Sequence, residues 1–452
     1  MSLEPPAPSE AESVAGQDAE LDPELDSGLD PETLSRARGG LLRHHDFRQL
    51  FVAKATSSVG TQLTTLALPV LAVKVLDADA FQMGLLGTFE FLAFLVVGLP
   101  AGAWVDRWRR KRVLITNDLV RAVALGSLPL AWALGWLTLP QLLLVALVTG
   151  TCTVFFDVAD QSYLPEIVES HQISEGNAKL QAAESVSMIA GPALAGGLIK
   201  LVGSASTIGL DALSFLGSAF AVSRIRHEDH PPPRESRRPL HVEIAEGLRF
   251  VLRHPLLWRI TACTSTGNFF SSMSGALIVL YGLNQLHLDP GHLGLAFGIG
   301  SVGGLLGALT AARVADRVGE GRVIPLSALA WVPAQALVPL AGIVIAPMVA
   351  ISVSMLVVSF VVVLYNITQV SFRQRLCPRP LLGRMNASIR FIVWGSMPIG
   401  AFIGGVLGAT FSVRTVLWIS VGGALVAAFP VLFSPLISMG KMPDELDQLS
   451  ED

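Results

Sequence analysis

The sequence predicts an all-α, polytopic membrane protein with twelve transmembrane helices in two six-helix halves. Of its 452 residues, 51% are apolar and only 15% are Asp, Glu, Lys or Arg, whereas soluble domains carry about a quarter charged residues. The apolar residues form long blocks that short charged loops separate. This composition excludes a soluble enzyme, a disulfide-stapled scaffold and a disordered chain.

Twelve stretches between Phe47 and Ser438 are long and apolar enough to cross a bilayer, which takes about 20 residues. In hydrocarbon a helix satisfies its own backbone hydrogen bonds, so we expect each stretch to be helical. In chain order they cover residues 47–75, 81–105, 113–136, 140–163, 178–201, 205–225, 256–284, 291–315, 322–343, 346–371, 384–410 and 414–438.

The segments outside these stretches are polar and differ in charge. Residues 1–35 hold ten acids and no Lys or Arg, so the net charge of −4 leaves +6 on the remainder. We expect a disordered acidic tail (1–42), a first six-helix half (43–225), a linker (226–255), a second half (256–438) and a short second tail (439–452).

Basic residues lie in alternate loops, which predicts the orientation in the membrane. The loop after the second stretch contains Arg107, Arg109, Arg110, Lys111 and Arg112, and the linker is also basic. Positively charged loops stay in the cytoplasm, so both termini and the linker are expected there. These residues follow no single exposed face, and we therefore expect no nucleic-acid partner.

The sequence carries no pattern for a cofactor. The three cysteines, Cys152, Cys263 and Cys377, lie in or beside apolar segments and suggest neither disulfides nor a metal site. No Walker motif is present, so ATP is not expected to drive the protein. We expect neither enzymatic activity nor a bound cofactor or metal.

An internal repeat supports the division into two halves. The segment from Gly102 to Arg107 follows the second stretch, and the similar segment from Ala312 to Arg317 follows the eighth, 210 residues later. Two related six-helix units are typical of transporters that rock around a central site.

The loop from Gly102 to Arg112 resembles the signature loop of the major facilitator superfamily. Further stretches are similar to its bacterial drug- and siderophore-exporter branch, the enterobactin-exporter and macrolide-efflux group: residues 156–165, 176–180, 211–215 and 383–387. The resemblance spans roughly residues 43–438. It implies a monomeric transporter of a small molecule in the bacterial plasma membrane.

The fifth stretch resembles the motif that antiporters of this superfamily carry. It reads Gly191-Pro192-Ala-Leu-Ala195-Gly196-Gly197, with Ala195 where the motif has its first Gly. Pro192 should bend the helix, and small residues permit close approach of a neighbour. We expect that neighbour to be the eighth stretch, through Gly300, Gly303, Gly304 and Gly307. The alternative is a packing motif without a role in export direction.

Glu90 is the first candidate for proton coupling, because it lies near the middle of the second stretch between Phe residues. An ionisable group there is costly and calls for a functional or structural reason. Asp211 and Glu184 are further candidates, although structural pairing would also explain them. Much of the exporter branch has an acid after the Gly that matches Gly60; this chain has Thr61, which shifts the coupling toward Glu90.

A cytoplasmic gate is expected near Asp157 and Asp160, which share one helix face. Arg107 and Arg110 should lie close to these acids. As the resemblance implies, Asp106 would cap and brace this contact near the eleventh stretch, whose Arg390 is another candidate member of the gate. The spacing from Gly102 to Asp106 also favours a gate. The alternative for the basic loop is topology alone. Asp118 and Arg121 should form an i,i+3 pair, and Lys54 should extend to the inner surface.

The substrate cavity should be lined by uncharged polar groups and aromatics. Gln62, Asn268 and Gln335 fall near the middle of their stretches, and Phe94 and Trp394 add aromatic area. Such a pocket suits bulky amphipathic molecules.

These observations predict a proton-coupled exporter of drug-like or siderophore-like molecules that works by alternating access. A lipid or lysolipid flippase or an uptake symporter would share the fold. A membrane sensor or scaffold that transports nothing is a third interpretation.

Overall fold

The computed structural model describes residues 40–105, 107–169, 172–227, 240–378 and 381–439, and within them the chain is almost entirely helical. In the first half the helices are α2 (His45–Val75), α3 (Ala80–Val96), α4 (Gly98–Val105), α5 (Arg110–Ala133), α6 (Leu139–Ile167), α7 (Ile173–Val202) and α8 (Ser204–Ser223). The second half contains α10 (Leu257–Leu280), α11 (Pro290–Val318), α12 (Glu320–Leu340), α13 (Pro347–Leu376), α14 (Leu382–Thr410) and α15 (Val413–Leu432). In the chain, α9 (Leu240–Arg253) connects the first half to the second.

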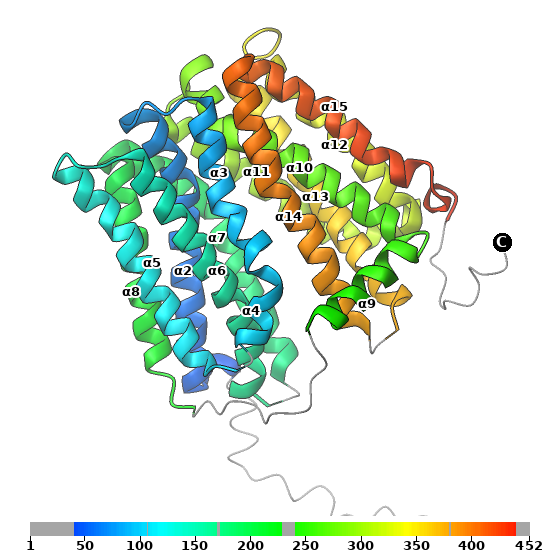
Figure 1. Ribbon diagram of the computed structural model, residues 1–452, viewed down its shortest axis with the longest axis horizontal. Coiled ribbons are helices and arrows are strands. Elements are labelled where there is room, and N and C mark those ends of the chain that lie inside the picture. The colour runs from blue at the N-terminus through cyan, green and yellow to red at the C-terminus, as the bar shows by residue number, and fades with distance from the viewer. Residues whose placement is uncertain (1–39, 106, 170–171, 228–239, 379–380, 440–452) are drawn as a thin grey trace, which may run out of the picture.

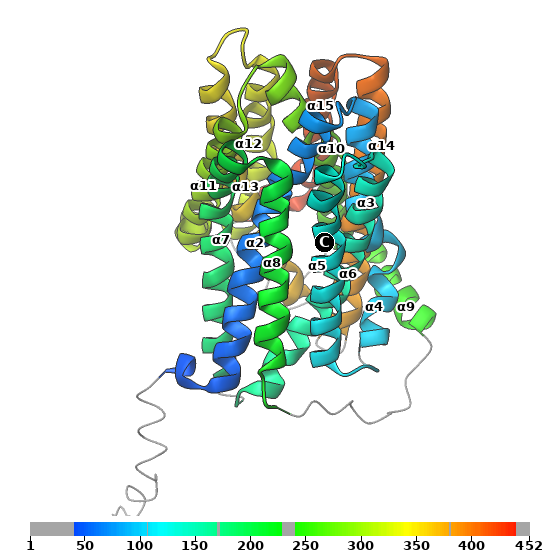
Figure 2. The ribbon, with the colours of Figure 1, turned by 90° about the vertical axis from the view of Figure 1, so that its left-hand side faces the viewer.

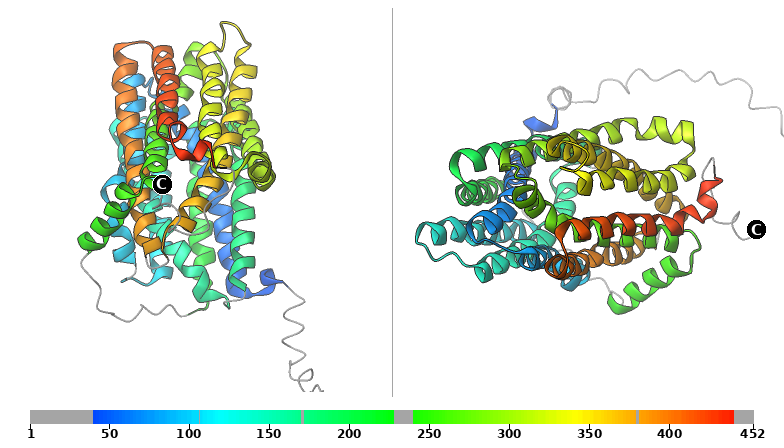
Figure 3. Two further views of the ribbon diagram at one scale, coloured as in Figure 1. Left: turned by 90° about the vertical axis from the view of Figure 1, so that its right-hand side faces the viewer. Right: turned by 90° about the horizontal axis from the view of Figure 1, so that it is seen from above.

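The predicted all-α fold with twelve spans in two halves is confirmed. Ten helices of the described chain are long and apolar enough to cross a membrane on their own. The other two spans are α10, which continues into a π-helical turn at Tyr281–Gln285, and the pair α3 and α4. The two six-helix bundles stand side by side, as the view from above in Figure 3 shows.

The second span, predicted as one helix over 81–105, is instead broken between Val96 and Gly98. Pro100 has no N–H to give to the carbonyl of Val96, and its ring disfavours a straight helix at that carbonyl. Hydrogen bonds from Val97 N to Ala93 O (2.8 Å) and from Ala101 N to Val97 O (2.9 Å) continue on either side. A Gly at the break also removes any side chain that would resist it.

The linker, predicted as a polar connection, contains the amphipathic helix α9, which packs against α14. The Arg384 guanidinium lies 2.5 Å from the Glu246 carboxylate, and Val251 is fully buried. Gly247 lies so close to the carbonyl of Arg384 that a Cβ would be 2.5 Å from its oxygen. Apolar residues at spacings of three and four, such as Leu248 and Val251, were the missed signal.

We call the end of the bundle at which α9 lies the linker end; it is the lower end in Figures 1 and 2. At the opposite end, one large cluster of buried side chains joins both halves, including Leu71 and Met83 of the first and Leu277 and Leu293 of the second. At the linker end the clusters are separate. One lies in the first half around Phe47 and Tyr163, and one lies in the second around Phe372 and Met385.

Candidate functional site: a cavity between the halves

A cavity of about 290 Å³ lies where the shared packing ends and the two halves separate. Phe94 of α3 and Trp394 of α14 form its aromatic wall, with ring centres 4.5 Å apart. Both residues were predicted to line the substrate cavity. The described lining residues are Phe94, Gly98, Val154, Asp157, Val158, Asn386, Ala387, Arg390, Phe391 and Trp394.

Two opposite charges stand on different walls of this central cavity. Asp157 comes from α6 in the first half, and Arg390 comes from α14 in the second. The Arg390 guanidinium lies over the Trp394 ring, 5.2 Å from its centre, a distance at which a cation and an aromatic face attract. The cavity can therefore contact an aromatic surface and a charged or polar group of one molecule. Phe391 and Asn386 complete the wall on α14, and sequence reasoning had not proposed them as lining residues.

Three of the predicted cavity residues lie elsewhere. Gln62 packs between α2 and α7, where a Cβ on Gly191 would be 2.3 Å from the Gln62 Cβ. Asn268 lines a small cavity of about 50 Å³ inside the second half, and Gln335 lines a separate one of about 260 Å³. Position near mid-span could not distinguish these three places, because it does not say which neighbour a helix face meets.

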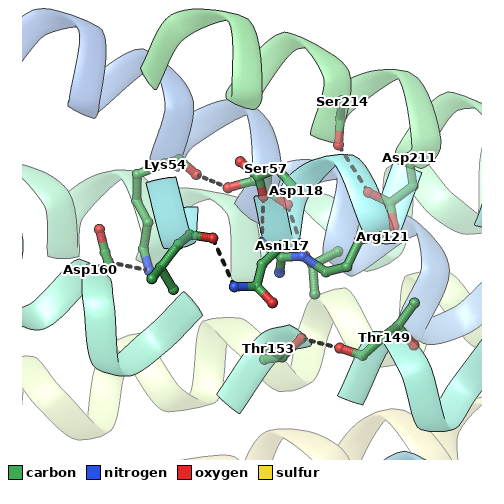
Figure 4. A network of polar contacts seen from close by, with 12 residues as sticks. Lys54, Ser57, Asn117, Asp118, Arg121, Thr149, Thr153, Asp160, Asp211 and Ser214 are labelled. Atoms are coloured by element: carbon green, nitrogen blue, oxygen red, sulfur yellow. Dashed lines mark hydrogen bonds and ion pairs between the residues drawn. The ribbon is translucent and has the colours of Figure 1, made fainter. Parts of the chain in front are cut away.

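A network of buried charges runs through the first half, next to the central cavity (Figure 4). Lys54 of α2 donates to Asp160 of α6 at 3.1 Å, so it does not extend to the surface as predicted. Asp118 and Arg121 form the predicted i,i+3 pair at 2.5 Å, and both are buried. The Arg121 guanidinium also lies 4.4 Å and 4.2 Å from the ring centres of two Phe residues, Phe156 and Phe215.

Asp211 of α8 is part of the same network and only 1% exposed. Its carboxylate accepts hydrogen bonds from Thr64 of α2 and, at 2.9 Å, from Ser214. Gly60 makes this approach possible, since a Cβ there would be 2.2 Å from the Asp211 carboxylate. The carboxylate absent from position 61 of α2 is thus matched by one that reaches α2 from α8.

Glu90 lies near the middle of α3, half-buried. A Cβ on Gly150 would be 2.4 Å from the Glu90 carbonyl oxygen, so α6 packs directly on this part of α3. Within the described chain no hydrogen bond or ion pair to the Glu90 carboxylate is formed. Glu184 of α7 is half-buried and lies within electrostatic range of Lys54.

The basic loop does not meet Asp157 and Asp160, contrary to prediction. Arg110, at the start of α5, pairs with Glu166 near the end of α6, and Arg107 is exposed. Asp157 lies nine residues before Glu166, which places it roughly 13 Å deeper along the helix. Gly102 lies in α4, and Asp106 falls outside the described residues.

The Gly-Pro segment of α7 packs on α11, but through different glycines from those predicted. A Cβ on Gly294 would be 2.4 Å from the Pro192 carbonyl oxygen and 2.8 Å from Gly196 Cα, and Gly298 faces Ala193. Gly300, Gly303, Gly304 and Gly307 face α13 instead, because they lie on another side of the helix from 294 and 298. Gly197 has open space around it.

The second contact between the halves joins α3 and α14 through Gly84 and Gly405. A Cβ on Gly84 would be 2.3 Å from Gly405 Cα, and Thr88 donates to the Pro398 carbonyl at 3.3 Å.

At the same end of the molecule, Asp289 caps α11 by accepting from the His292 N–H at 2.9 Å. That hydrogen bond, assisted by the Lys200 charge, holds the pKa of Asp289 below its ordinary value. The α7–α11 and α3–α14 contacts both lie beyond the central cavity, at the end opposite the linker end.

Three comparisons identify the family. Residues 50–398 match the model of the Major Facilitator Superfamily. The chain is 28% identical over 420 residues to the multidrug efflux pump Tap of Mycolicibacterium fortuitum, covering 89% of this chain and 96% of that protein. It is 25% identical over 376 residues to the enterobactin exporter EntS of Escherichia coli O127:H6, covering 82% and 86%. A bacterial homologue of the iron transporter ferroportin in its inward-facing state superposes with a TM-score of 0.70 at 17% identity, covering 87% of this chain and 98% of that one. The chain belongs to the Major Facilitator Superfamily, and it is a multi-pass membrane transporter of small molecules.

Proposed function

We propose that this transporter exports amphipathic, drug-like or siderophore-like molecules across the bacterial plasma membrane in exchange for protons. The observation that carries the proposal is the central cavity, where the aromatic pair Phe94 and Trp394 stands beside the opposed charges of Asp157 and Arg390. Relatives named as a multidrug efflux pump and an enterobactin exporter support export.

The orientation follows from charge at the linker end. Arg107, Arg109, Arg110, Lys111 and Arg112 all lie there, between α4 and the start of α5. Positive charge is retained in the cytoplasm, so the linker end and both termini are cytoplasmic in this proposal. The halves are then joined at the outer end and separated at the inner end. This is the inward-facing arrangement, which lets a molecule enter the cavity from the cytoplasm.

Export requires a change to the outward-facing arrangement, in which the inner ends meet. Asp157 and Arg390 are suited to close the inner side, because they face each other from different halves. The ion pair that they form on closure would replace the substrate between them. Arg110 stabilises the inner end of the first half through Glu166, so in this proposal it supports the gate rather than forming it.

Proton coupling rests on carboxylates that can lose their charge inside the protein. Burial in a poorly solvated site favours the neutral form of an acid. Glu90 has no charge partner among the described residues, so it is our first candidate. Asp211 is more deeply buried, but it is held by Thr64 and Ser214. Glu184 is the third, beside Lys54. The working unit is a monomer in this proposal.

Inside-out proteoliposomes test the proposal. An imposed pH gradient with an acidic lumen should drive uptake of erythromycin, tetracycline or enterobactin, and a protonophore should abolish it. Trp394→Ala should reduce the rate for every accepted compound, since it removes the aromatic wall. The matched control is Trp258→Ala, which removes a half-exposed Trp outside the central cavity. Transport that ignores the gradient, or moves only with it reversed, would contradict proton-coupled export.

A further inference from the structure

A cavity of about 260 Å³ lies inside the second half, and none of its described lining residues also lines the central cavity. Helices α10, α11, α12, α13 and α15 all contribute to its wall. Its lining consists of Ser271, Ser274, Gly275, Ile278, Phe297, Trp331, Gln335, Val338, Pro339, Ser354, Met355, Val358 and Leu417. These five helices all belong to the second half, so the cavity lies at a different place from the central cavity between the halves.

Two buried polar atoms in this wall have no partner in the described chain. Gln335 is 9% exposed, and its amide nitrogen donates to Ser274 at 3.3 Å, while its Oε1 accepts nothing. Ser354 is 1% exposed, and its hydroxyl is also unpaired. Buried polar groups without hydrogen bonds are costly and rare in native proteins. A bound molecule that meets both atoms would remove that cost.

The rest of the wall decides the chemistry of that molecule. Among the described residues, no Asp, Glu, Lys, Arg or His lines the cavity, so a charged ligand would lose its hydration without compensation. Trp331, Phe297 and Met355 offer aromatic and thioether surface, which favours contact with an aromatic ring. An apolar cavity of roughly 150 Å³ holds benzene, and this larger one has room for a second ring.

We propose that this cavity binds an uncharged aromatic molecule of two fused rings that carries a hydroxyl group. The hydroxyl donates to Gln335 Oε1 and accepts from Ser354 Oγ, so one group satisfies both unpaired atoms. The proposal does not depend on export or on proton coupling, because it concerns equilibrium binding within one half.

Equilibrium dialysis of the full-length protein in nanodiscs, against empty nanodiscs, tests this site. The probes are 2-naphthol, 2-fluoronaphthalene, which has the same shape but cannot donate, and the charged 2-naphthoate. We expect saturable binding of one 2-naphthol per chain, binding of 2-fluoronaphthalene weaker by about tenfold, as one lost hydrogen bond implies, and no binding of 2-naphthoate. Retention of 2-naphthol no greater than in empty nanodiscs would mean that only water or lipid fills the cavity, and would overturn the proposal.

Gly275 lines the cavity, and a Cβ at this position meets nothing within 4 Å, so Gly275→Leu is designed to occupy this space. It should abolish 2-naphthol binding. Gly422→Leu is the matched control, since that glycine also has open space around it but lies on the exposed side of α15. Undiminished binding in Gly275→Leu would place the ligand elsewhere and overturn the site.

Gln335→Leu should weaken 2-naphthol about tenfold and leave 2-fluoronaphthalene unchanged. Ser354→Ala, a smaller change, tests the second contact if Gln335→Leu folds poorly. Ser352→Ala is its control, because that buried hydroxyl is likewise unpaired but does not line the cavity. Equal loss for both probes in Gln335→Leu and in Ser354→Ala would show a general packing defect and contradict the proposed hydrogen bonds.

Discussion

Lys54 and Asp160 form an ion pair of 3.1 Å between α2 and α6, with side chains that are only 16% and 11% exposed. The pair is not isolated, because Asp157 and Glu184 also act on the Lys54 charge. The Lys54 ammonium thus interacts electrostatically with three carboxylates of the first half. Its removal and the removal of one acid are therefore unequal changes.

Lys54→Met should destabilise the protein by roughly 3 kcal/mol, because it leaves buried carboxylates without their cation. Asp160→Asn should cost less, since two acids still compensate Lys54. Thermal unfolding of the purified variants in one detergent measures the difference. The double variant Lys54→Met/Asp160→Leu should recover part of the loss. An equal effect of the two single substitutions would show that Asp157 and Glu184 do not share the cation.

Gly84→Val should shift the protein toward the outward-facing state, because its side chain cannot fit against Gly405. Spin labels at Lys74 and Phe411, at the outer end of different halves, should report a longer distance than in the parent protein. Gly422→Val is the control, as nothing lies near that glycine. An unchanged distance in Gly84→Val would mean that the contact between α3 and α14 does not hold the outer side closed.

Glu90→Gln should fold normally and bind substrate, yet lose uphill export driven by a pH gradient. The amide copies the protonated acid with little change in volume, and it cannot release a proton. Exchange of substrate for substrate in proteoliposomes should persist, because that mode needs no proton release. Should the variant pump at the parental rate, Glu90 is structural, and Asp211→Asn and Glu184→Gln become the decisive variants.

Neutralising either side of the inner gate, by Asp157→Asn or Arg390→Gln, should slow transport by roughly tenfold or more, since one charge then lacks its partner on closure. The exchanged variant Asp157→Arg/Arg390→Asp should regain part of the rate. Initial export rates in proteoliposomes provide the comparison, together with labelling of a cysteine introduced at Ala387 in the cavity. If the exchanged variant is no better than the single ones, the two residues act separately.

Much of the fold could be predicted because twenty-residue apolar stretches leave the backbone little choice but a helix. The break at Gly98 and Pro100 and the helix from Leu240 to Arg253 had local signals that hydropathy alone hides. The site was less accessible to prediction. Phe94 and Trp394 were anticipated, but the match of Lys54 to Asp160, or of Gly294 to Gly196, depends on the rotation and register of packed helices. Those quantities arise from tertiary contacts that a single sequence does not display.

The interruption between Val96 and Gly98 divides the second span into two helices that can move separately. The longer helix, α3, packs on α14 through Gly84 and Gly405, whereas the shorter helix, α4, leads to the basic loop. Because the helix is interrupted here, we expect α4 to change its angle while α3 stays packed on α14. Substitutions that straighten the break, such as Gly98→Ala together with Pro100→Ala, would make the two helices move as a single rod. Each opening of the linker end would then strain the contact between α3 and α14 at the opposite end.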